Sequence, residues 1–199
     1  MKRFCVILLA LCLLLAGCGG QKAQKDLTPV CIEGKWGYAD AEGRLVIDAQ
    51  YTMANSFSEG LALVTDDPDK LFWKYIDTTG KQAFPDQFGK AGNFSQGLAM
   101  VMIAGKCGYI NKKGELVIEP RYGFARAFAK NGLAPVKVDQ LWGYIDREGN
   151  MVIQPQFFDA EPFDSTGTAM VVTSDAKRAT LQEDGTYTVL SDSEIVLVD

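Results

Sequence analysis

Around residue 142, the pattern of hydrophobic and polar positions predicts three short β-strands in succession. One strand is expected over residues 133–138. A second contains Trp142 and Tyr144, which share a face because side chains alternate along a strand. A third follows at 151–153, and Pro155 ends it because proline has no N–H to donate to a neighbouring strand. The segment is therefore expected to form a three-stranded antiparallel meander.

The turn between the second and third strands carries its own signal. Asp146 supplies a side-chain oxygen that can accept hydrogen bonds from the turn, and Gly149 tolerates the positive φ that a tight hairpin requires. Glycine holds the same place in three earlier stretches, at Gly43, Gly80 and Gly114.

This phrase occurs four times, at intervals of about 35 residues, which indicates a repeat architecture. The four stretches are WGYADAEGRLVIDAQY (36–51), WKYIDTTGKQAFPDQF (73–88), CGYINKKGELVIEPRY (107–122) and WGYIDREGNMVIQPQF (142–157). Their recurring landmarks are Trp36, Tyr38, Gly43, Trp73, Tyr75, Gly80, Tyr109, Gly114, Trp142, Tyr144 and Gly149. Including the strand before each phrase, units are predicted near 27–60, 61–97, 98–132 and 133–167. A degenerate fifth unit, with Thr180 near the tyrosine place, is expected to cap the array over 168–199.

The repeated phrase resembles that of the WG-repeat (KWG-repeat) proteins of bacteria over roughly residues 27–190. The resemblance implies a β-rich repeat scaffold, usually exported or exposed, and supplies no catalytic residue. There are departures from the pattern: Lys74 replaces the glycine in the second copy, Cys107 replaces the tryptophan in the third, and Ala49 and Asp86 stand where proline is expected.

The predicted strands carry apolar residues on both faces, so both faces must be covered. Leu61 and Leu63 lie on one face of a strand, and Ala62 and Val64 on the other. An all-β open, solenoid-like array of stacked meanders satisfies this requirement, and a closed five-bladed β-propeller is the alternative. The resemblance favours the open array, because copy number varies among WG-repeat proteins.

The N-terminus predicts export and lipid attachment. Residues 1–17 have the form of a signal peptide, with Lys2 and Arg3 before an apolar run too short to span a bilayer. The sequence LAGC at 15–18 resembles the lipobox of bacterial lipoproteins, in which the cysteine is diacylated. Cys18 is therefore expected to anchor the chain on the extracytoplasmic side of a bacterial cell membrane. Residues 18–26 are expected to serve as a flexible tether to the β domain, 27–199.

Composition argues against catalysis and against binding to nucleic acid. The chain contains no histidine, which removes histidine-dependent triads and histidine metal sites, and no cofactor or catalytic residue is predicted. The net charge is −5, and the chain becomes more negative without Lys2 and Arg3, so a nucleic-acid partner is not expected. The acidic run at 65–69 could attract Ca²⁺, but a solvated loop is the favoured interpretation.

Two cysteines remain in the predicted β domain, Cys31 and Cys107. They lie in different units, and distant units rarely bring Cβ atoms within about 4.5 Å, so two separate buried thiols are favoured over a disulfide.

The tryptophans separate two hypotheses of function. If Trp36, Trp73 and Trp142 are buried, they pack the repeats together, which is the favoured interpretation because large aromatic residues mostly serve cores. If they are exposed, they could stack on sugar rings of the cell wall. The sequence therefore predicts a non-enzymatic, lipid-anchored surface scaffold for an unidentified protein partner, with glycan binding as the alternative.

Overall fold

The computed structural model describes residues 26–191, and every regular element in that range is a β-strand. The strands form five antiparallel sheets in which neighbours follow chain order, so the all-β class and the meander topology are confirmed. No helix that could cross a membrane occurs within 26–191.

The strands have the following bounds. The first sheet consists of β1 (Thr28–Ile32), β2 (Lys35–Ala39) and β3 (Leu45–Tyr51), and the second of β4 (Met53–Ala54), β5 (Leu61–Thr65) and β6 (Lys74–Asp77). The third consists of β7 (Lys90–Ala91), β8 (Leu98–Ile103), β9 (Lys106–Asn111) and β10 (Leu116–Tyr122). The fourth consists of β11 (Phe124–Ala125), β12 (Ala134–Val138), β13 (Leu141–Ile145) and β14 (Met151–Phe157). The fifth consists of β15 (Asp159–Ala160), β16 (Thr168–Val172), β17 (Arg178–Gln182) and β18 (Tyr187–Val189).

Sequence reasoning missed the two-residue strands β4, β7, β11 and β15, which open the second to fifth sheets. These sheets therefore begin ahead of the predicted unit starts at Leu61, Leu98, Leu133 and Thr168. The strands are too short to show alternation, but one signal was present. Each short strand ends in an alanine at the same place after the WG position: Ala54, Ala91, Ala125 and Ala160.

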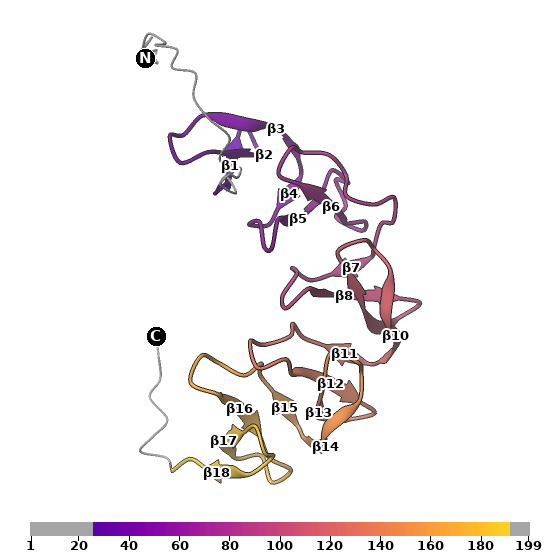
Figure 1. Ribbon diagram of the computed structural model, residues 1–199, viewed down its shortest axis with the longest axis vertical. Helices are drawn as coiled ribbons and strands as arrows, with labels where there is room; N and C mark the ends of the chain where they lie inside the picture. The colour runs from indigo at the N-terminus through magenta and orange to yellow at the C-terminus, as the bar shows by residue number, and fades with distance from the viewer. Residues whose placement is uncertain (1–25, 192–199) are drawn as a thin grey trace, which may run out of the picture.

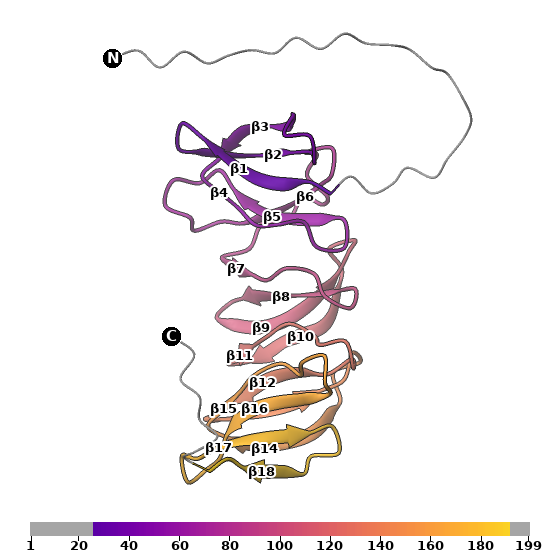
Figure 2. The same ribbon diagram turned by 90° about the vertical axis from the view of Figure 1, so that its left-hand side faces the viewer.

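The five sheets follow one another along an open curve, from indigo at one end to yellow at the other (Figure 1). In the view turned by 90° the first and fifth sheets again lie at opposite ends (Figure 2). The ends do not meet, so the predicted open array is confirmed and the closed five-bladed ring is not formed.

A separate hydrophobic core fills each space between consecutive sheets, which explains why the strands are apolar on both faces. Between the first two sheets, Tyr38 and Ile47 pack with Val64 and Ile76, all nearly inaccessible to solvent. Three equivalent clusters join the second sheet to the third, the third to the fourth and the fourth to the fifth. The array is thus a stack in which each sheet buries apolar side chains against its neighbours.

The glycine of the WG pair allows the third strand of a sheet to lie close to the second. A Cβ on Gly143 would lie 2.8 Å from the nitrogen of Pro155 and closer still to the carbonyl oxygen of Ile153. Gly37 and Gly108 are crowded in the same way by the third strands of their own sheets. Where Lys74 replaces this glycine, only isolated bridges at Trp73–Phe88 and Ile76–Gln82 remain in place of a third strand.

The four tyrosines of the phrase tie each sheet to the next one. Each phenol donates a hydrogen bond to a backbone carbonyl that follows the first strand of the next sheet: Tyr38 to Asn55 (2.7 Å), Tyr75 to Gly92 (2.5 Å), Tyr109 to Arg126 (2.7 Å) and Tyr144 to Glu161 (2.7 Å). Burial raises the pKa of all four phenols. The tyrosines are therefore neutral hydrogen-bond donors between sheets.

The turn glycines have two roles. All have positive φ, from +77° at Gly43 to +87° at Gly185. In addition, from the second unit onward, each turn packs on the preceding sheet. A Cβ on Gly80 would lie 3.1 Å from the Ile47 side chain, and one on Gly114 would lie 2.8 Å from the Phe84 ring. A side chain at these positions would push adjacent sheets apart.

The fifth sheet ends the series. Thr180 pairs with Met170 at the register position where Tyr144 pairs with Pro135, which places Thr180 at the tyrosine position. Arg178 likewise holds the place of Trp142. Met170 is 41% exposed, because no further sheet within 26–191 covers this face. A threonine and an arginine suit a face that meets water.

Candidate functional site

One edge of the array collects exposed apolar side chains. This edge, here named the tryptophan edge, holds the turns that join β1 to β2, β5 to β6, β8 to β9, β12 to β13 and β16 to β17, together with the starts of the WG strands. Its large exposed hydrophobic residues are Ile32, Met53, Leu71, Phe72, Ile103, Phe124 and Phe158. Leu71 and Phe72 are 58% and 56% exposed, the highest values among large hydrophobic side chains in the described chain.

The opposite edge, here named the glycine edge, consists of polar turns, and in the first four sheets an aspartate or asparagine accepts hydrogen bonds from the backbone of each turn. Asp146 Oδ1 accepts hydrogen bonds from the N–H groups of Glu148 (3.1 Å) and Asn150 (2.8 Å). Desolvation alone would raise the pKa of Asp146, but hydrogen bonds from Asn150 and the turn backbone outweigh it and lower the pKa. Neighbouring turns are also joined, as in the Lys112–Glu59 ion pair at 3.0 Å. Asp40 and Asp77 accept the same turn hydrogen bonds, so the edge has a structural explanation.

The tryptophans themselves do not form an exposed stripe. Trp142 is buried and Trp36 and Trp73 are half-buried, and each packs on one of the inter-sheet cores. Cys107, at the tryptophan place in the third copy, is 1% exposed. The rings are thus mainly packing residues, although two of them retain partial contact with water.

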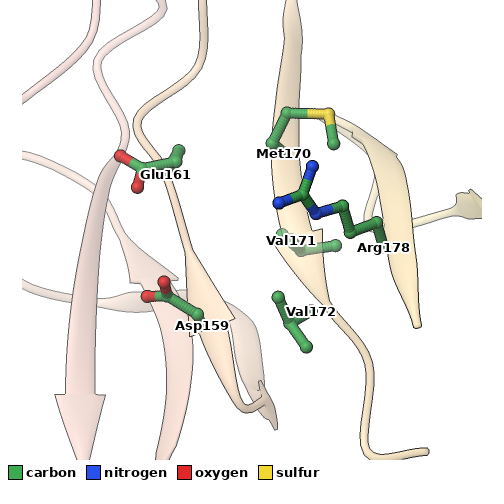
Figure 3. A pocket seen from close by; sticks show the side chains of 6 residues that line it. All are labelled: Asp159, Glu161, Met170, Val171, Val172 and Arg178. Carbon is green, nitrogen blue, oxygen red and sulfur yellow. The ribbon is translucent and has the colours of Figure 1, made fainter. Parts of the chain in front are cut away.

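A charged cleft of about 230 Å³ lies on the fifth sheet, lined by residues of β15, β16 and β17 and by Glu161, at the end of the tryptophan edge. Figure 3 shows Asp159 and Glu161 on one side and Met170 and Arg178 on the other. Arg126, from the fourth sheet, donates to Asp159 at 3.0 Å, pairs with Glu161 and lies 5.1 Å from the ring of Trp142. The two carboxylates are therefore held by an arginine in an ion-paired arrangement, which gives no free acid–base pair for catalysis. Sequence reasoning missed this cluster because its members come from three separate strands and connectors.

The arrangement was compared with known proteins. A family model described as "WG containing repeat" matches residues 36–67, 73–107, 108–142 and 142–175, which is more than half of the chain. The chain belongs to the WG-repeat family. A comparison with curated proteins found no match.

Solved structures with a similar fold are β-propeller-like proteins. Hsv2 of Kluyveromyces lactis with loop 6CD replaced by a Gly-Ser linker aligns with a TM-score of 0.56 and 11% identity, over 87% of this chain and 67% of that chain. Hsv2 of Kluyveromyces marxianus aligns with a TM-score of 0.56 and 12% identity, over 87% of this chain and 62% of that chain. A further Kluyveromyces lactis Hsv2 structure gives 0.54 and 12%, over 90% of this chain and 65% of that one. At such identities the likeness concerns the fold alone, and the WG-repeat chain spans about two thirds of these proteins.

The acidic run at 65–69 of this WG-repeat protein forms a structured loop. Asp66 pairs with Lys74 at 2.6 Å. Asp67 accepts hydrogen bonds from the N–H groups of Asp69 (3.0 Å) and Leu71 (2.9 Å). No cluster of three metal-ligating side chains occurs among residues 26–191. The carboxylates of Asp66 and Asp67 thus shape the loop.

Both cysteines of the described chain are free thiols, so a disulfide does not join Cys31 and Cys107. Cys107 is buried as expected, and burial raises the pKa of its thiol. Cys31 is exposed, contrary to the expectation of two buried thiols, because β1 is an edge strand of the first sheet with no sheet before it in the described range. Cys18, predicted to carry the lipid, lies outside the described residues.

Proposed function

We propose that this WG-repeat protein is a non-enzymatic, surface-exposed scaffold, held to a bacterial membrane by lipid on Cys18, whose tryptophan edge binds a protein partner. The observation that carries the proposal is the contrast between the two edges. Large apolar side chains are exposed along one edge, whereas the turns of the other are occupied by hydrogen bonds and ion pairs within the chain.

The composition of the tryptophan edge supports a protein partner. Protein interfaces are enriched in aromatic residues and methionine, and this edge exposes Phe72, Phe124, Phe158 and Met53. Among the exposed hydrophobic residues elsewhere, Val117 and Val152 on the third strands are aliphatic and serve as controls below. The open array also offers a long surface along which a partner could contact several repeats at once.

A crosslinking pull-down from intact cells tests the proposal. We compare the full chain with a Phe124→Ser, Phe158→Ser variant on the edge and with a Val117→Ser, Val152→Ser variant on the third strands. The four residues are exposed by 44% to 50% in the wild type, so the two pairs are matched in exposure. The edge variant is expected to lose the captured protein while the control keeps it. Equal capture by both variants would remove the tryptophan edge as the binding surface.

The lipid anchor is tested separately. Metabolic labelling with an alkyne fatty acid is expected to mark the wild type and to miss the Cys18→Ser variant. Equal labelling of the two proteins would rule out attachment through Cys18. The basis of this part of the proposal is the LAGC sequence at 15–18 behind a short apolar run.

Glycan binding is the second candidate, and it rests on the partial exposure of Trp36 and Trp73. Acrylamide quenching of tryptophan fluorescence, with and without peptidoglycan fragments, addresses it. Protection of the fluorescence by the fragments, lost in a Trp36→Leu variant, would favour glycan binding over a protein partner. Turnover of a glycan or peptide substrate by the purified chain would instead overturn the non-enzymatic part of the proposal.

A further inference from the structure

The loop of residues 66–72 is an addition to the repeat, since it makes the connection between β5 and β6 longer than the equivalent connection in any other sheet of the described chain. It projects from the tryptophan edge and ends in Leu71 and Phe72, the two most exposed large hydrophobic residues of the described chain. Exposure of two large apolar side chains to water at the tip of a loop is unfavourable, and a surface that covers them removes this free-energy cost.

The loop is held in one shape by hydrogen bonds on every side. Thr65 Oγ1 donates to the carbonyl of Phe72 (2.6 Å) and accepts from the N–H of Asp67 (3.1 Å). Trp73 Nε1 donates to the carbonyl of Lys70 (3.2 Å), and Asp67 accepts from the N–H of Leu71. The exposure of Leu71 and Phe72 is therefore a fixed feature of the surface, and a preorganised loop loses little freedom on binding.

A negative charge accompanies the apolar pair. The carboxylate of Asp69, two residues before Leu71, is exposed and takes part in no hydrogen bond or ion pair within 26–191. A surface complementary to this loop therefore needs an apolar hollow with a positive charge at its rim.

The chain itself has such a hollow between the third and fourth sheets. This cleft, here named the Arg121 cleft, has a volume of about 330 Å³ and is lined by Arg121, Tyr122, Val138, Gly149 and Met151. The Arg121 guanidinium lies 5.1 Å from the Tyr122 ring and donates to the Tyr122 hydroxyl (2.8 Å) and to the Gly149 carbonyl (2.7 Å). No carboxylate of the described chain neutralises it, so its charge is available at the rim.

We infer that the loop of residues 66–72 docks into the Arg121 cleft of a second copy of this chain. Leu71 and Phe72 would fill the apolar hollow, and Asp69 would face Arg121. The loop does not occupy the cleft of its own chain, because Leu71 and Phe72 are more than half exposed. A hydrophobic projection that fits a pocket elsewhere on the same molecule is the condition for such a contact between copies. The inference requires neither the partner protein nor the glycan considered above.

Site-directed crosslinking between full-length copies tests it. Two differently tagged copies are co-expressed in a Cys31→Ser background, one with Leu71→Cys and the other with Met151→Cys, and are treated with a short bismaleimide. The matched control replaces Met151→Cys with Val152→Cys, which is adjacent in β14, does not line the cleft and is 48% exposed. The cleft pair is expected to crosslink at least about tenfold more than the control pair.

Charge reversal sharpens the test. Asp69→Lys on the loop copy should lower the crosslink by about tenfold, and Arg121→Glu on the cleft copy should restore part of it in that combination. Because Arg121→Glu also removes hydrogen bonds to Gly149, Phe72→Ser on the exposed loop provides an independent variant that leaves the fold intact, and it too should lower the yield. Equal crosslinking by the cleft and control pairs, a yield unaffected by both Asp69→Lys and Phe72→Ser, or capture of a different protein by the loop cysteine would overturn the inference.

Discussion

The second and fourth sheets are built from the same phrase, yet they differ in their third strand. In the fourth sheet, Gly143 lets β14 lie against β13 along seven residues, from Met151 to Phe157. In the second, Lys74 stands at the glycine position, and the segment after β6 makes only isolated bridges. The inter-sheet core survives because Phe84 fills the place of Ile153.

The difference shows which parts of the phrase serve the sheet and which serve the stack. The tyrosine, the turn glycine and the apolar residue of the third segment hold neighbouring sheets together, and the second unit keeps all three in Tyr75, Gly80 and Phe84. The glycine after the tryptophan serves only the third strand of its own sheet. The second unit lacks it, and the same unit carries the added loop of residues 66–72.

The largest expected effect comes from transferring the second unit's substitution to the fourth. Gly143→Lys places a Cβ against the Ile153 carbonyl and should lower the free energy of unfolding by about 3 kcal/mol or more. The reverse change, Lys74→Gly, meets no close third strand and should cost only about 1 kcal/mol, through lost strand propensity and the lost ion pair with Asp66. Urea unfolding followed by circular dichroism measures both. If the two variants lost similar amounts of unfolding free energy, Gly143 would not be needed for the close approach of the third strand.

The turn glycines provide a second contrast. Gly43→Ala must adopt a positive φ but meets no atom within 4 Å, so it should cost about 1 kcal/mol. Gly114→Ala bears the same backbone cost and in addition presses on the buried Phe84 ring at 2.8 Å, which should add roughly 1–3 kcal/mol. Thermal unfolding of the two variants compares them, and an equal loss would show that turns do not pack on the preceding sheet.

The inter-sheet tyrosines should make the array sensitive to alkali. Burial raises the pKa of Tyr144 above the value of about 10 in an unfolded chain, so its stabilising contribution is complete below about pH 10 and is lost as pH rises further. Phenol absorbance and circular dichroism should therefore change together in an alkaline titration. Tyr144→Phe, which removes the bond to Glu161, should cost about 1 kcal/mol at neutral pH. Ionisation of the four tyrosines with the β spectrum intact would contradict this assignment.

The smallest effect is expected from the aspartates of the glycine edge. The pKa of Asp146 is lowered on folding, so its contribution is present above about pH 4 and is lost as pH falls below that value. The third unit has Asn111 at this place, where its side-chain oxygen accepts the same turn hydrogen bonds, from the N–H groups of Lys113 and Glu115. Asp146→Asn should therefore keep the turn and weaken the acid dependence of the unfolding midpoint between pH 2 and about pH 5. An unchanged acid dependence in Asp146→Asn would mean that the Asp146 carboxylate does not cause it.

The architecture was predictable because its causes are local. Strand alternation around Trp142, the Asp146–Gly149 turn and the fixed interval between copies are visible in single stretches of sequence, and the apolar residues on both faces of 61–64 required sheets on both sides. The burial of Trp142 and Cys107 followed from the same argument.

Features that depend on contacts between units were not predictable in this way. Strand β4 has only Met53 and Ala54, which form a strand because β5 offers free backbone groups beside them. The acidic run at 65–69 suggested a solvated loop, but the sequence could not show that hydrogen bonds from Thr65 and Trp73 fix it and expose Leu71 and Phe72. The ion pairs of Arg126 join residues from different sheets, so no local sequence pattern predicts them.

The open array is the claim on which the proposed interaction surface depends, and energy transfer between its two ends tests it most directly. Cys31 in β1 is an exposed thiol, and a Val189→Cys substitution provides a second exposed thiol in β18. In residues 19–199, which include all five sheets, dyes on these two positions lie at opposite ends of the curve (Figure 1). For an open array, the efficiency of energy transfer between the two dyes is expected to equal that in the urea-unfolded chain or to be only modestly higher. Efficient transfer, as expected for adjacent sheets, would mean that the first and fifth sheets meet in a closed ring and would contradict the open array.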